Sequence, residues 1–408
     1  MTETVLAPKV QGGRRGPTVL LAVGHGSVDI YQGFVPVLVP FLVAERHYDY
    51  VAVSGFVLAA TVLSSVVQPL FGLLTDRWAV RGTGRWLVPV SMLVTGLGVA
   101  LLGVGGTYWL TLAVIALSGV GVAAYHPEGA RLARSVTGGE PVRMSWFSLG
   151  GNVGFALAPV LATPVLAVWG LSAAPLLIVP ALIGIGVSAP LLRRAPAAEA
   201  ASVGGASAGG GSAGGASARR AGGADNWPAF RRLTSVIMLR SVAYVGLSTF
   251  LGLFVQQRLH DSAAASGFAL FALYAGGAVG TVLGGRLAVR WGRLRVLRAA
   301  YVAAAVALAG VVLVPGPAVL VFVTAAALTL YMPFSLHITL GQDYLPSRIG
   351  TASGVTLGLA VSAGGVFAPV LGLLAKATSL QTTLACLIVL PALAWLLARR
   401  LPDPNPPA

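Results

Sequence analysis

An acidic residue, Asp29, lies near the middle of the apolar stretch Val19–Val43, VLLAVGHGSVDIYQGFVPVLVPFLV. A helix needs ~20 apolar residues to cross a bilayer, so this stretch is long enough to do so. An ionisable group at that depth is costly unless it faces a cavity or a partner. We therefore interpret Asp29 as a proton-carrying group beside an aqueous path. The alternative is a helix that breaks near Gly33 or Pro36 and leaves Asp29 at the lipid headgroups.

A second charge, Arg240, lies in the middle of another apolar stretch, 211 residues after Asp29. The two residues could form a buried ion pair. An ion pair between Asp29 and Arg240 would add little stability, because the cost of desolvating two charges can exceed their attraction. It would serve better as a switch, in which a proton on Asp29 or an anion on Arg240 releases the other partner. A static bridge is the alternative.

Two further titratable residues, His126 and Glu128, flank Pro127 at the end of the segment SGVGVAAYHPEGA (118–130). The proline predicts a helix break there. A histidine and a carboxylate beside a break could relay protons near neutral pH, or they could cap a helix at the membrane surface. The small residues before them favour close helix packing.

The composition is that of a helical protein with many membrane spans. Of 408 residues, 56% are hydrophobic and only 10% charged, and the mean hydropathy is +0.84. Soluble domains carry about 25% charged residues. In a membrane protein, the positions of the lysines and arginines in the loops matter more than their total. The net charge of +15 is therefore not a sign of nucleic-acid binding. A lone cysteine, Cys386, excludes an intramolecular disulfide and a thiolate metal cluster.

Twelve apolar segments can be delimited by charges and turn residues, six on each side of one break. They cover residues 17–44, 50–75, 86–105, 107–127, 144–168, 171–192, 229–257, 263–288, 296–314, 317–340, 350–375 and 379–398. The break, APAAEAASVGGASAGGGSAGGASARRAGGADN (195–226), is too poor in apolar residues to fold by itself. We expect a six-helix bundle at 1–192, a linker at 193–228 and a second six-helix bundle at 229–408.

Lysine and arginine predict the orientation. Only Arg46, Arg258 and Lys376 fall in loops on one side, Arg240 is inside a span, and the other 23 of the 27 lie on the opposite side. Positive residues concentrate in cytoplasmic loops. The bias therefore places both termini and the linker in the cytoplasm of a plasma or inner membrane protein.

The two halves repeat each other in sequence. The segment GLLTDRW (72–78) aligns with GRLAVRW (285–291), His126 with His337, and APVL at 158–161 with APVL at 368–371, all at offsets of 210 to 213 residues. An internally duplicated helical chain is typical of secondary transporters, whose substrate site lies between the repeats.

The segment Gly72–Arg85, GLLTDRWAVRGTGR, resembles the loop signature of the major facilitator superfamily. That resemblance implies two six-helix bundles that alternate between inward and outward access, with Gly72, Asp76 and Arg77 in a conformational gate. This sequence has extra residues between Arg77 and Gly84. The alternative is an ordinary basic loop.

The fifth span, SLGGNVGFALAP (148–159), is similar to the glycine- and proline-rich fifth span of drug-extruding facilitators. Glycine and proline allow bending and close approach in membrane helices. We expect a flexible seam in the fifth and eleventh spans, with Gly150, Gly154 and Pro159 in the gate. Asn152 either bonds a neighbouring helix or lines the cavity.

Three stretches, GHGSVDIYQGF (24–34), AAYHPEGARLA (123–133) and the end of the tenth span through Gln342, together resemble the fosmidomycin-resistance branch of the superfamily. The resemblance implies a proton-driven exporter of small compounds. The matching polar positions are His25, Asp29, His126, Glu128, His337 and Gln342. Gly24 and Gly26 stand where bulkier residues are usual, so the pocket shape, and with it the substrate, is left open.

These observations predict a proton-coupled antiporter that exports a small drug-like or anionic compound. Proton coupling is assigned to Asp29, His126 and Glu128, and substrate binding to Arg240, His25, Tyr31, Gln32, Asn152, His337 and Gln342. An importer of a sugar, organic anion or other metabolite is the alternative, and a non-transporting receptor or scaffold is a third. We expect the lipid bilayer, protons and a small molecule as partners, no nucleic acid, no cofactor, no metal and a monomer. Motifs of an enzyme, such as a phosphate-binding glycine loop, a zinc-ligand cluster or a serine elbow, are absent from the sequence.

Overall fold

The computed structural model is built from helices. It describes residues 15–68, 70–71, 74, 86–137, 141–205, 224–259, 263–346, 348, 352 and 355–404, and these contain no strand. Eight helical stretches among them are long and apolar enough to cross a membrane, and three shorter apolar helices accompany them. One of the eight, Trp146–Leu192, contains a chain reversal. The predicted number of twelve spans stays a prediction.

The first half of the chain forms α1 (Arg15–Arg46), α2 (Tyr50–Val66), α4 (Leu87–Ala100) with the short η2 (Leu101–Gly103), α5 (Tyr108–Thr137), α6 (Pro141–Trp169), η3 (Gly170–Ile178) and α7 (Val179–Gly205). Gly170 reverses the chain between α6 and η3 with φ of +66°, which favours glycine. The Glu45 carboxylate accepts the Leu171 N–H there at 3.0 Å.

The second half forms α8 (Trp227–Arg258), α9 (Ala263–Trp291), α10 (Arg293–Leu313), η6 (Gly316–Ala318), α11 (Val319–Tyr331), α12 (Phe334–Tyr344), η7 (Val355–Leu359), α14 (Ala360–Ala377) and α15 (Leu380–Arg399). The helix breaks between α11 and α12 at Pro333, whose ring cannot continue the helical hydrogen bonds.

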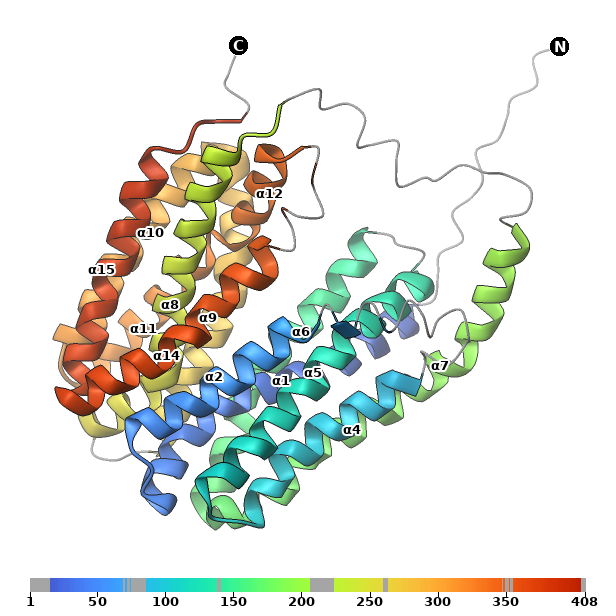
Figure 1. The fold of residues 1–408 in the computed structure, drawn as a ribbon, viewed down its shortest axis with the longest axis horizontal. Coiled ribbons are helices and arrows are strands. Elements are labelled where there is room, and N and C mark those ends of the chain that lie inside the picture. The colour runs from blue at the N-terminus through green and yellow to red at the C-terminus, as the bar shows by residue number, and fades with distance from the viewer. Residues whose placement is uncertain are drawn as a thin grey trace.

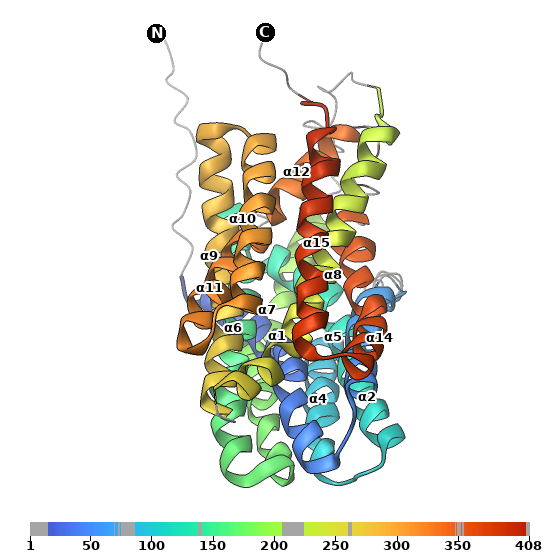
Figure 2. The ribbon, with the colours of Figure 1, turned by 90° about the vertical axis from the view of Figure 1, so that its left-hand side faces the viewer.

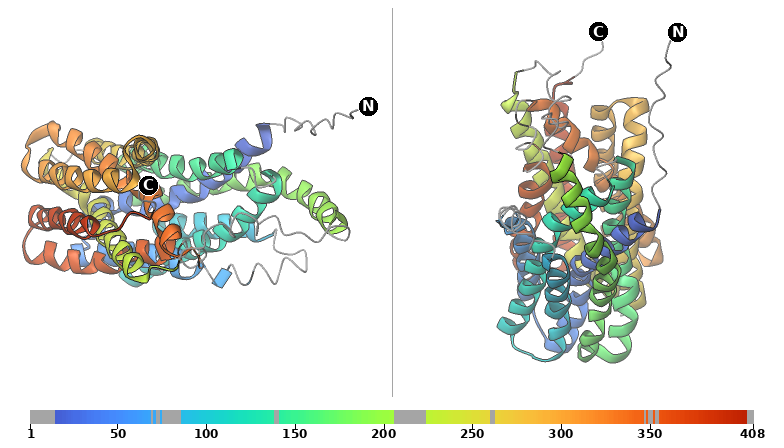
Figure 3. Two further views of the ribbon diagram at one scale, coloured as in Figure 1. Left: turned by 90° about the horizontal axis from the view of Figure 1, so that it is seen from above. Right: turned by 90° about the vertical axis from the view of Figure 1, so that its right-hand side faces the viewer.

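The helices gather in two groups. Helices α8 to α15 lie on one side in Figure 1, and α1 with α4 to α7 on the other. The groups meet where α2 packs on α14, α6 on α9 and α1 on α8. Seen from the side in Figure 2, most helices run in nearly the same direction, and the two further views in Figure 3 show the same two groups. The two groups are therefore in direct contact through these three helix pairs.

The two ends of the molecule differ. At the end where α8 begins and α15 ends, here called the linker end, Arg232 donates to the Arg400 carbonyl and Arg298 to the Ala398 carbonyl. At the other end, here called the latch end, Lys376 of α14 pairs with Asp49 beside α2 at 2.7 Å. Gln257 of α8 donates to the Tyr50 hydroxyl at 3.3 Å. The two helix groups are therefore tied by polar bonds at the latch end.

The repeat seen in the sequence extends to helix ends. Arg46 at the end of α1 donates to the Leu102 carbonyl, and Arg258 at the end of α8 donates to the Val314 carbonyl. Donors and acceptors are each separated by 212 residues (258 − 46 and 314 − 102). Each arginine satisfies a carbonyl that a helix terminus leaves without an intrahelical partner. The two halves therefore use the same device at equivalent positions.

Two predictions about the helices were wrong. Helix α5 runs through Pro127 to Thr137 without a break, because a membrane helix tolerates a proline whose freed carbonyl finds another partner. Helix α7 continues to Gly205, into the predicted linker, since the segment APAAEAA is rich in alanine, the strongest helix former. The domain boundaries remain a prediction, with α7 ending and α8 beginning inside the segment 193–228. The gate residues Gly72, Asp76 and Arg77 lie outside the described residues.

Candidate functional site

Asp29 lies between two histidines. His25 is one turn earlier on α1, and its Nε2 is 3.2 Å from Asp29 Oδ2. His126 comes from α5, and its Nε2 is 3.2 Å from Asp29 Oδ1. All three side chains lie in the interior of the first helix group, although His126 is the most open of them. We call these three residues the His–Asp–His cluster.

Backbone carbonyls orient both imidazoles. His25 Nδ1 lies 2.8 Å from the Phe147 carbonyl oxygen, and His126 Nδ1 lies 2.8 Å from the Val122 carbonyl oxygen. A carbonyl oxygen only accepts, so each Nδ1 must carry the hydrogen and donate it. In the neutral ring, each Nε2 then holds a lone pair that faces the Asp29 carboxylate. Such an arrangement is favourable only with a positive charge at Nε2, either a proton or another cation.

The cluster is tightly enclosed. The His25 ring stacks on Phe147, with 4.2 Å between ring centroids. Gly151 of α6 closes the other side, because a side chain there would place its Cβ 2.9 Å from His25 Cε1. Within the described part of the chain, His25 Nε2 and Asp29 Oδ1 are buried without a hydrogen-bond partner. These two atoms are therefore open to a cation, either a proton or another positive ion.

Arg240 does not pair with Asp29, contrary to the predicted switch. Its Nε donates to the Leu330 carbonyl, and its guanidinium carbon lies 4.7 Å from the Tyr331 ring centroid and 5.4 Å from that of Phe334. Leu330 is among the last four residues of α11, whose carbonyls have no intrahelical donor, so its carbonyl is free to accept. Arg240 is only 3% exposed, and none of the described carboxylates lies within 4 Å of its nitrogens.

A cavity of about 150 Å³ lies beside Arg240, between the two helix groups. Its walls include Gln32 of α1, Phe155 of α6 and several aromatic and hydroxyl side chains of the second half, namely Ser241, Tyr244, Ser248, Tyr274, Tyr331 and Phe334. Phe155 and Tyr274 meet across the two groups, with centroids 5.7 Å apart. We call this cavity the central pocket. It combines one cation with aromatic rings and a few hydroxyl and amide groups.

Of the residues predicted to bind substrate, Arg240 and Gln32 line the central pocket, and three others occupy different environments. His25 belongs to the His–Asp–His cluster. Tyr31 is 1% exposed, and its hydroxyl donates to the Leu177 carbonyl and accepts from the Ala181 N–H, so it holds α1 against η3 and α7. His337 is buried against the Tyr301 hydroxyl, at 3.0 Å.

The remaining predicted residues are less central. Asn152 is exposed on α6, and Gln342 is half-buried on α12; neither lines the central pocket. Glu128 was assigned to proton coupling, but its carboxylate pairs with Arg131 at 2.6 Å on the same helix. Its nearness to His126 in sequence does not bring it into the cluster, since residues two apart on a helix point in different directions.

The predicted gate glycines of α6 join helices within one half. A Cβ on Gly150 or Gly154 would overlap the α1 backbone carbonyls of Ala22 and Gly26, and Pro159 is buried on the same helix. The contacts between the two helix groups use other small residues that sequence reasoning missed. A Cβ added to Gly267 of α9 would lie 2.6 Å from Thr163 of α6. A Cβ added to Gly365 of α14 would lie 2.6 Å from Thr61 of α2.

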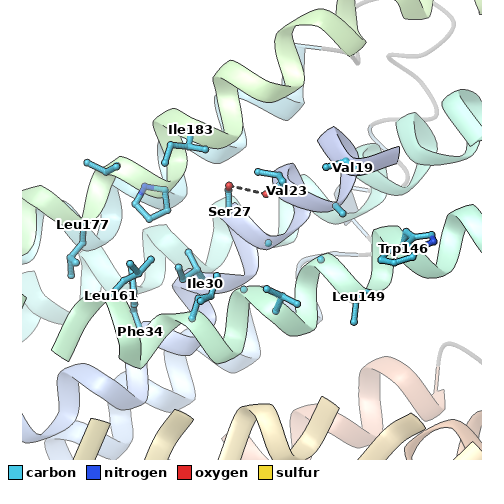
Figure 4. A pocket seen from close by; sticks show the side chains of 18 of the residues that line it. Val19, Val23, Ser27, Ile30, Phe34, Trp146, Leu149, Leu161, Leu177 and Ile183 are labelled. Atoms are coloured by element: carbon cyan, nitrogen blue, oxygen red, sulfur yellow. Dashed lines mark hydrogen bonds between the residues drawn. The ribbon is translucent and has the colours of Figure 1, made fainter. Parts of the chain in front are cut away.

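An apolar groove of about 1110 Å³ is bounded by α1, α6, η3 and α7. Figure 4 shows Val19, Val23 and Ile30 of α1 and Ile183 of α7 along it. Ser27 also lines it, but the Ser27 hydroxyl is bonded to the Val23 carbonyl at 2.8 Å. No charged residue is among those that line it, so the groove fits hydrocarbon rather than an ion.

A family model for the Major Facilitator Superfamily matches residues 21–369. The chain belongs to the Major Facilitator Superfamily. It is thus an integral membrane transporter and not an enzyme, with the all-α, multispan fold that the sequence predicted.

Two bacterial proteins are similar to this chain along nearly their whole length. The chain is 28% identical to the fosmidomycin resistance protein of Escherichia coli (strain K12) over 393 residues, which cover 92% of this chain and 90% of that one. It is 27% identical over 394 residues to the uncharacterized MFS-type transporter YfnC of Bacillus subtilis (strain 168), with coverage of 93% and 91%.

Solved facilitator structures share the fold of this transporter. One is a bacterial homolog of the human lysosomal transporter Spinster in an inward-facing, unoccupied conformation. It has a TM-score of 0.71 at 16% identity, covering 95% of this chain and 98% of that one. In this facilitator, the central pocket lies between the two helix groups, lined by side chains of both halves.

Proposed function

We propose that this facilitator is a proton-coupled antiporter that exports a small anionic or drug-like compound. The observation that carries the proposal is Arg240, a buried cation at the wall of the central pocket with no described carboxylate within ion-pair distance. Gln32 and the aromatic rings beside it complete a site for a compact anion that carries an apolar part.

The electrostatics favour an anionic ligand. An uncompensated charge in a low-dielectric interior is costly, and the faces of Tyr331 and Phe334 compensate it only in part. A carboxylate, phosphate or phosphonate would form charge-assisted hydrogen bonds with the guanidinium. Arg240 would thus select the charge of the cargo, and the surrounding rings its shape.

The proton site would be the His–Asp–His cluster. Asp29 precedes Gln32 by three residues, about 4.5 Å along α1 at helical rise, so a proton bound at the cluster and an anion in the central pocket act on the same helix turn. Two ligands that change each other's affinity are coupled thermodynamically. Asp29 and His126 would carry the proton, while the Arg131 contact withdraws Glu128 from this role.

The name of the Escherichia coli relative supplies a first compound to test, fosmidomycin. Benzoate and phenylphosphonate extend the set, because each joins one anionic group to one ring. Everted membrane vesicles with an imposed pH gradient would show whether any of these is moved against its own gradient.

The decisive variant is Arg240→Gln. Removing a hydrogen bond to a charged partner costs about 1.5–3 kcal/mol, so we expect the affinity for the exported anion to fall about 10- to 100-fold, measured by titration calorimetry on purified protein. Arg231→Gln is the matched control, because Arg231 is an exposed arginine on the same helix and its loss should leave the affinity unchanged.

Unchanged anion affinity in Arg240→Gln would remove Arg240 from the substrate site. Proton-driven uptake into cells, without proton-driven accumulation in everted vesicles, would instead identify an importer. These two results are independent, since the first concerns the ligand and the second the direction of transport.

A further inference from the structure

We propose that His25, Asp29 and His126 form a binding site for a divalent transition-metal ion of the Zn²⁺ type. The proposal goes beyond the function proposed above and does not rest on it, because it concerns binding to the protein and not transport.

The donor set is that of a known class of metal site. Two imidazole Nε2 atoms and one carboxylate match the ligands that zinc takes in sites that keep one position open. All three side chains offer a donor atom to one point, and these atoms lie within 4.8 Å of one another. The ligands come from two helices, α1 and α5, which pack on each other and are labelled next to each other in Figure 1.

The spacing of the donors fits coordination. With metal–ligand distances of about 2.0–2.1 Å, a tetrahedral ion separates its ligand atoms by about 3.3–3.4 Å. The two nitrogen–oxygen separations at Asp29 are both 3.2 Å. The two imidazoles face different oxygens of that carboxylate, and the three donor atoms span up to 4.8 Å, so a bound ion would draw the imidazoles together around it.

The outer contacts favour ligation by Nε2. In metal sites, a ligating histidine usually donates its other ring N–H to a carbonyl or carboxylate, which fixes the tautomer. Phe147 and Val122 supply those carbonyls, each at 2.8 Å from Nδ1. Both Nε2 lone pairs are thereby presented to the carboxylate.

Two donor atoms are buried and form no hydrogen bond in the described part of the chain, although each lies 3.2 Å from another donor atom of the cluster. These atoms are His25 Nε2 and Asp29 Oδ1. As whole residues, His25 is 8% exposed and Asp29 is 6% exposed. Buried polar atoms are almost always paired, so these two point to a ligand. Gly151 packs directly against them, since an added Cβ there would lie 2.4 Å from Asp29 Oδ2.

An ion can also enter the site. The side chain of His126 is 23% exposed, against 10% and 9% for the other two, so the site opens on the His126 side. Imidazole ligands favour zinc, copper, cobalt and nickel over magnesium and calcium, which prefer oxygen. We therefore expect Zn²⁺ and Co²⁺ to bind and Mg²⁺ not to compete.

The test is a titration of purified transporter in detergent with Zn²⁺ alone, followed by calorimetry, with Co²⁺ absorption as a spectroscopic readout. We expect one Zn²⁺ per chain and a Co²⁺ spectrum of four- or five-coordinate nitrogen and oxygen ligation. Asp29→Asn and His126→Gln should weaken binding at least about 100-fold, since loss of even an outer-shell partner typically costs 10- to 100-fold.

Two further variants separate the site from other effects. His47→Asn removes an exposed imidazole and should leave Zn²⁺ affinity unchanged. Gly151→Ala keeps all three ligands but would place a Cβ 2.4 Å from Asp29 Oδ2; it displaces the carboxylate and should weaken Zn²⁺ binding without removing a ligand. A native protein that binds no Zn²⁺ or gives only an octahedral Co²⁺ spectrum would overturn the proposal, as would equal affinity in the Asp29 and His126 variants. None of these results would decide whether protons drive transport.

Discussion

Asp29 and Arg240 have separate surroundings, although the sequence suggests that they face each other. Asp29 is held between two imidazoles, and Arg240 between a freed carbonyl and two aromatic rings. A charge in a membrane helix needs compensation, and the nearest polar or aromatic partners of each one lie within its own half. The negative and positive groups can therefore act on different ligands.

The residue-level prediction concerns Asp29→Asn. The substitution keeps the size of the side chain but removes the group that would take up the proton. We expect anion affinity to stay within about twofold, while proton-driven exchange in vesicles falls at least about tenfold, the scale of one lost charge interaction. Asp403→Asn, an exposed acid near the end of α15, should leave exchange unchanged. Full coupled exchange in Asp29→Asn would exclude Asp29 from the mechanism.

Helices α1 and α6 cross closely because glycines on both remove the side chains between their backbones. Gly26 and Gly33 of α1 and Gly150 and Gly154 of α6 all lie at this crossing. Close approach of this kind is the usual role of small residues in membrane helix packing. The crossing positions His25 and Asp29 against Gly151, so it supports the cluster.

At the scale of the element, we predict that Gly154→Ala destabilises the protein. The added Cβ would overlap the Gly26 carbonyl, and overpacking typically costs about 1–3 kcal/mol. The matched control is Gly186→Ala on α7, which has open space around it and should be neutral or slightly stabilising, since alanine is the better helix former. Thermal unfolding in detergent measures both. Equal melting temperatures for the two variants would refute the close crossing.

The sequence predicted the elements better than their contacts. Hydropathy and charge placed the helices, and the charged positions 29 and 240 could be singled out because ionisable groups are rare in apolar stretches. Periodicity does not say which helices meet, so the pairing of Asp29 with His126 across α1 and α5 could not be derived. The break at Pro333, which turns the Leu330 carbonyl toward Arg240, was hidden because prolines such as Pro127 leave other helices intact.

The whole molecule is joined at the latch end by Asp49 and Lys376, one from each helix group. Alternating access requires one end to open while the other closes, so this pair should separate once per cycle. Hydrogen bonding to Lys376 and to the Ala52 N–H lowers the pKa of Asp49 below its usual value. Both Asp49 and Lys376 are therefore charged at neutral pH.

We predict that tying the latch end shut stops transport. Asp49→Cys and Lys376→Cys, combined with Cys386→Ser to remove the exposed native thiol, allow a short bifunctional thiol reagent to link the two groups. Transport should be lost on linking and return on cleavage of the linker, while either single-cysteine variant treated in the same way stays active. Continued transport by the linked protein would show that this end need not open.

The same pair gives a pH prediction. The pKa of Asp49 is lowered when it is paired with Lys376. The ion pair therefore stabilises the closed latch end fully at any pH above the ordinary aspartate pKa of about 3.9. It is lost as the pH falls through the lower, folded value. Spin labels at positions 47 and 377 should thus report an unchanged closed fraction between about pH 7 and pH 5. A release within that range would mean that another group controls the latch.

The separation of opposite charges onto α1 and α8 also has an electrical consequence. If each turnover carries a proton inward on the His–Asp–His cluster and a monovalent anion outward beside Arg240, both movements transfer positive charge toward the cell interior. Each elementary charge gains about 2.3 kcal/mol per 100 mV of membrane potential. An inside-negative voltage would then drive the exchange even where the two compartments have equal acidity, and substrate flux would register as an inward current.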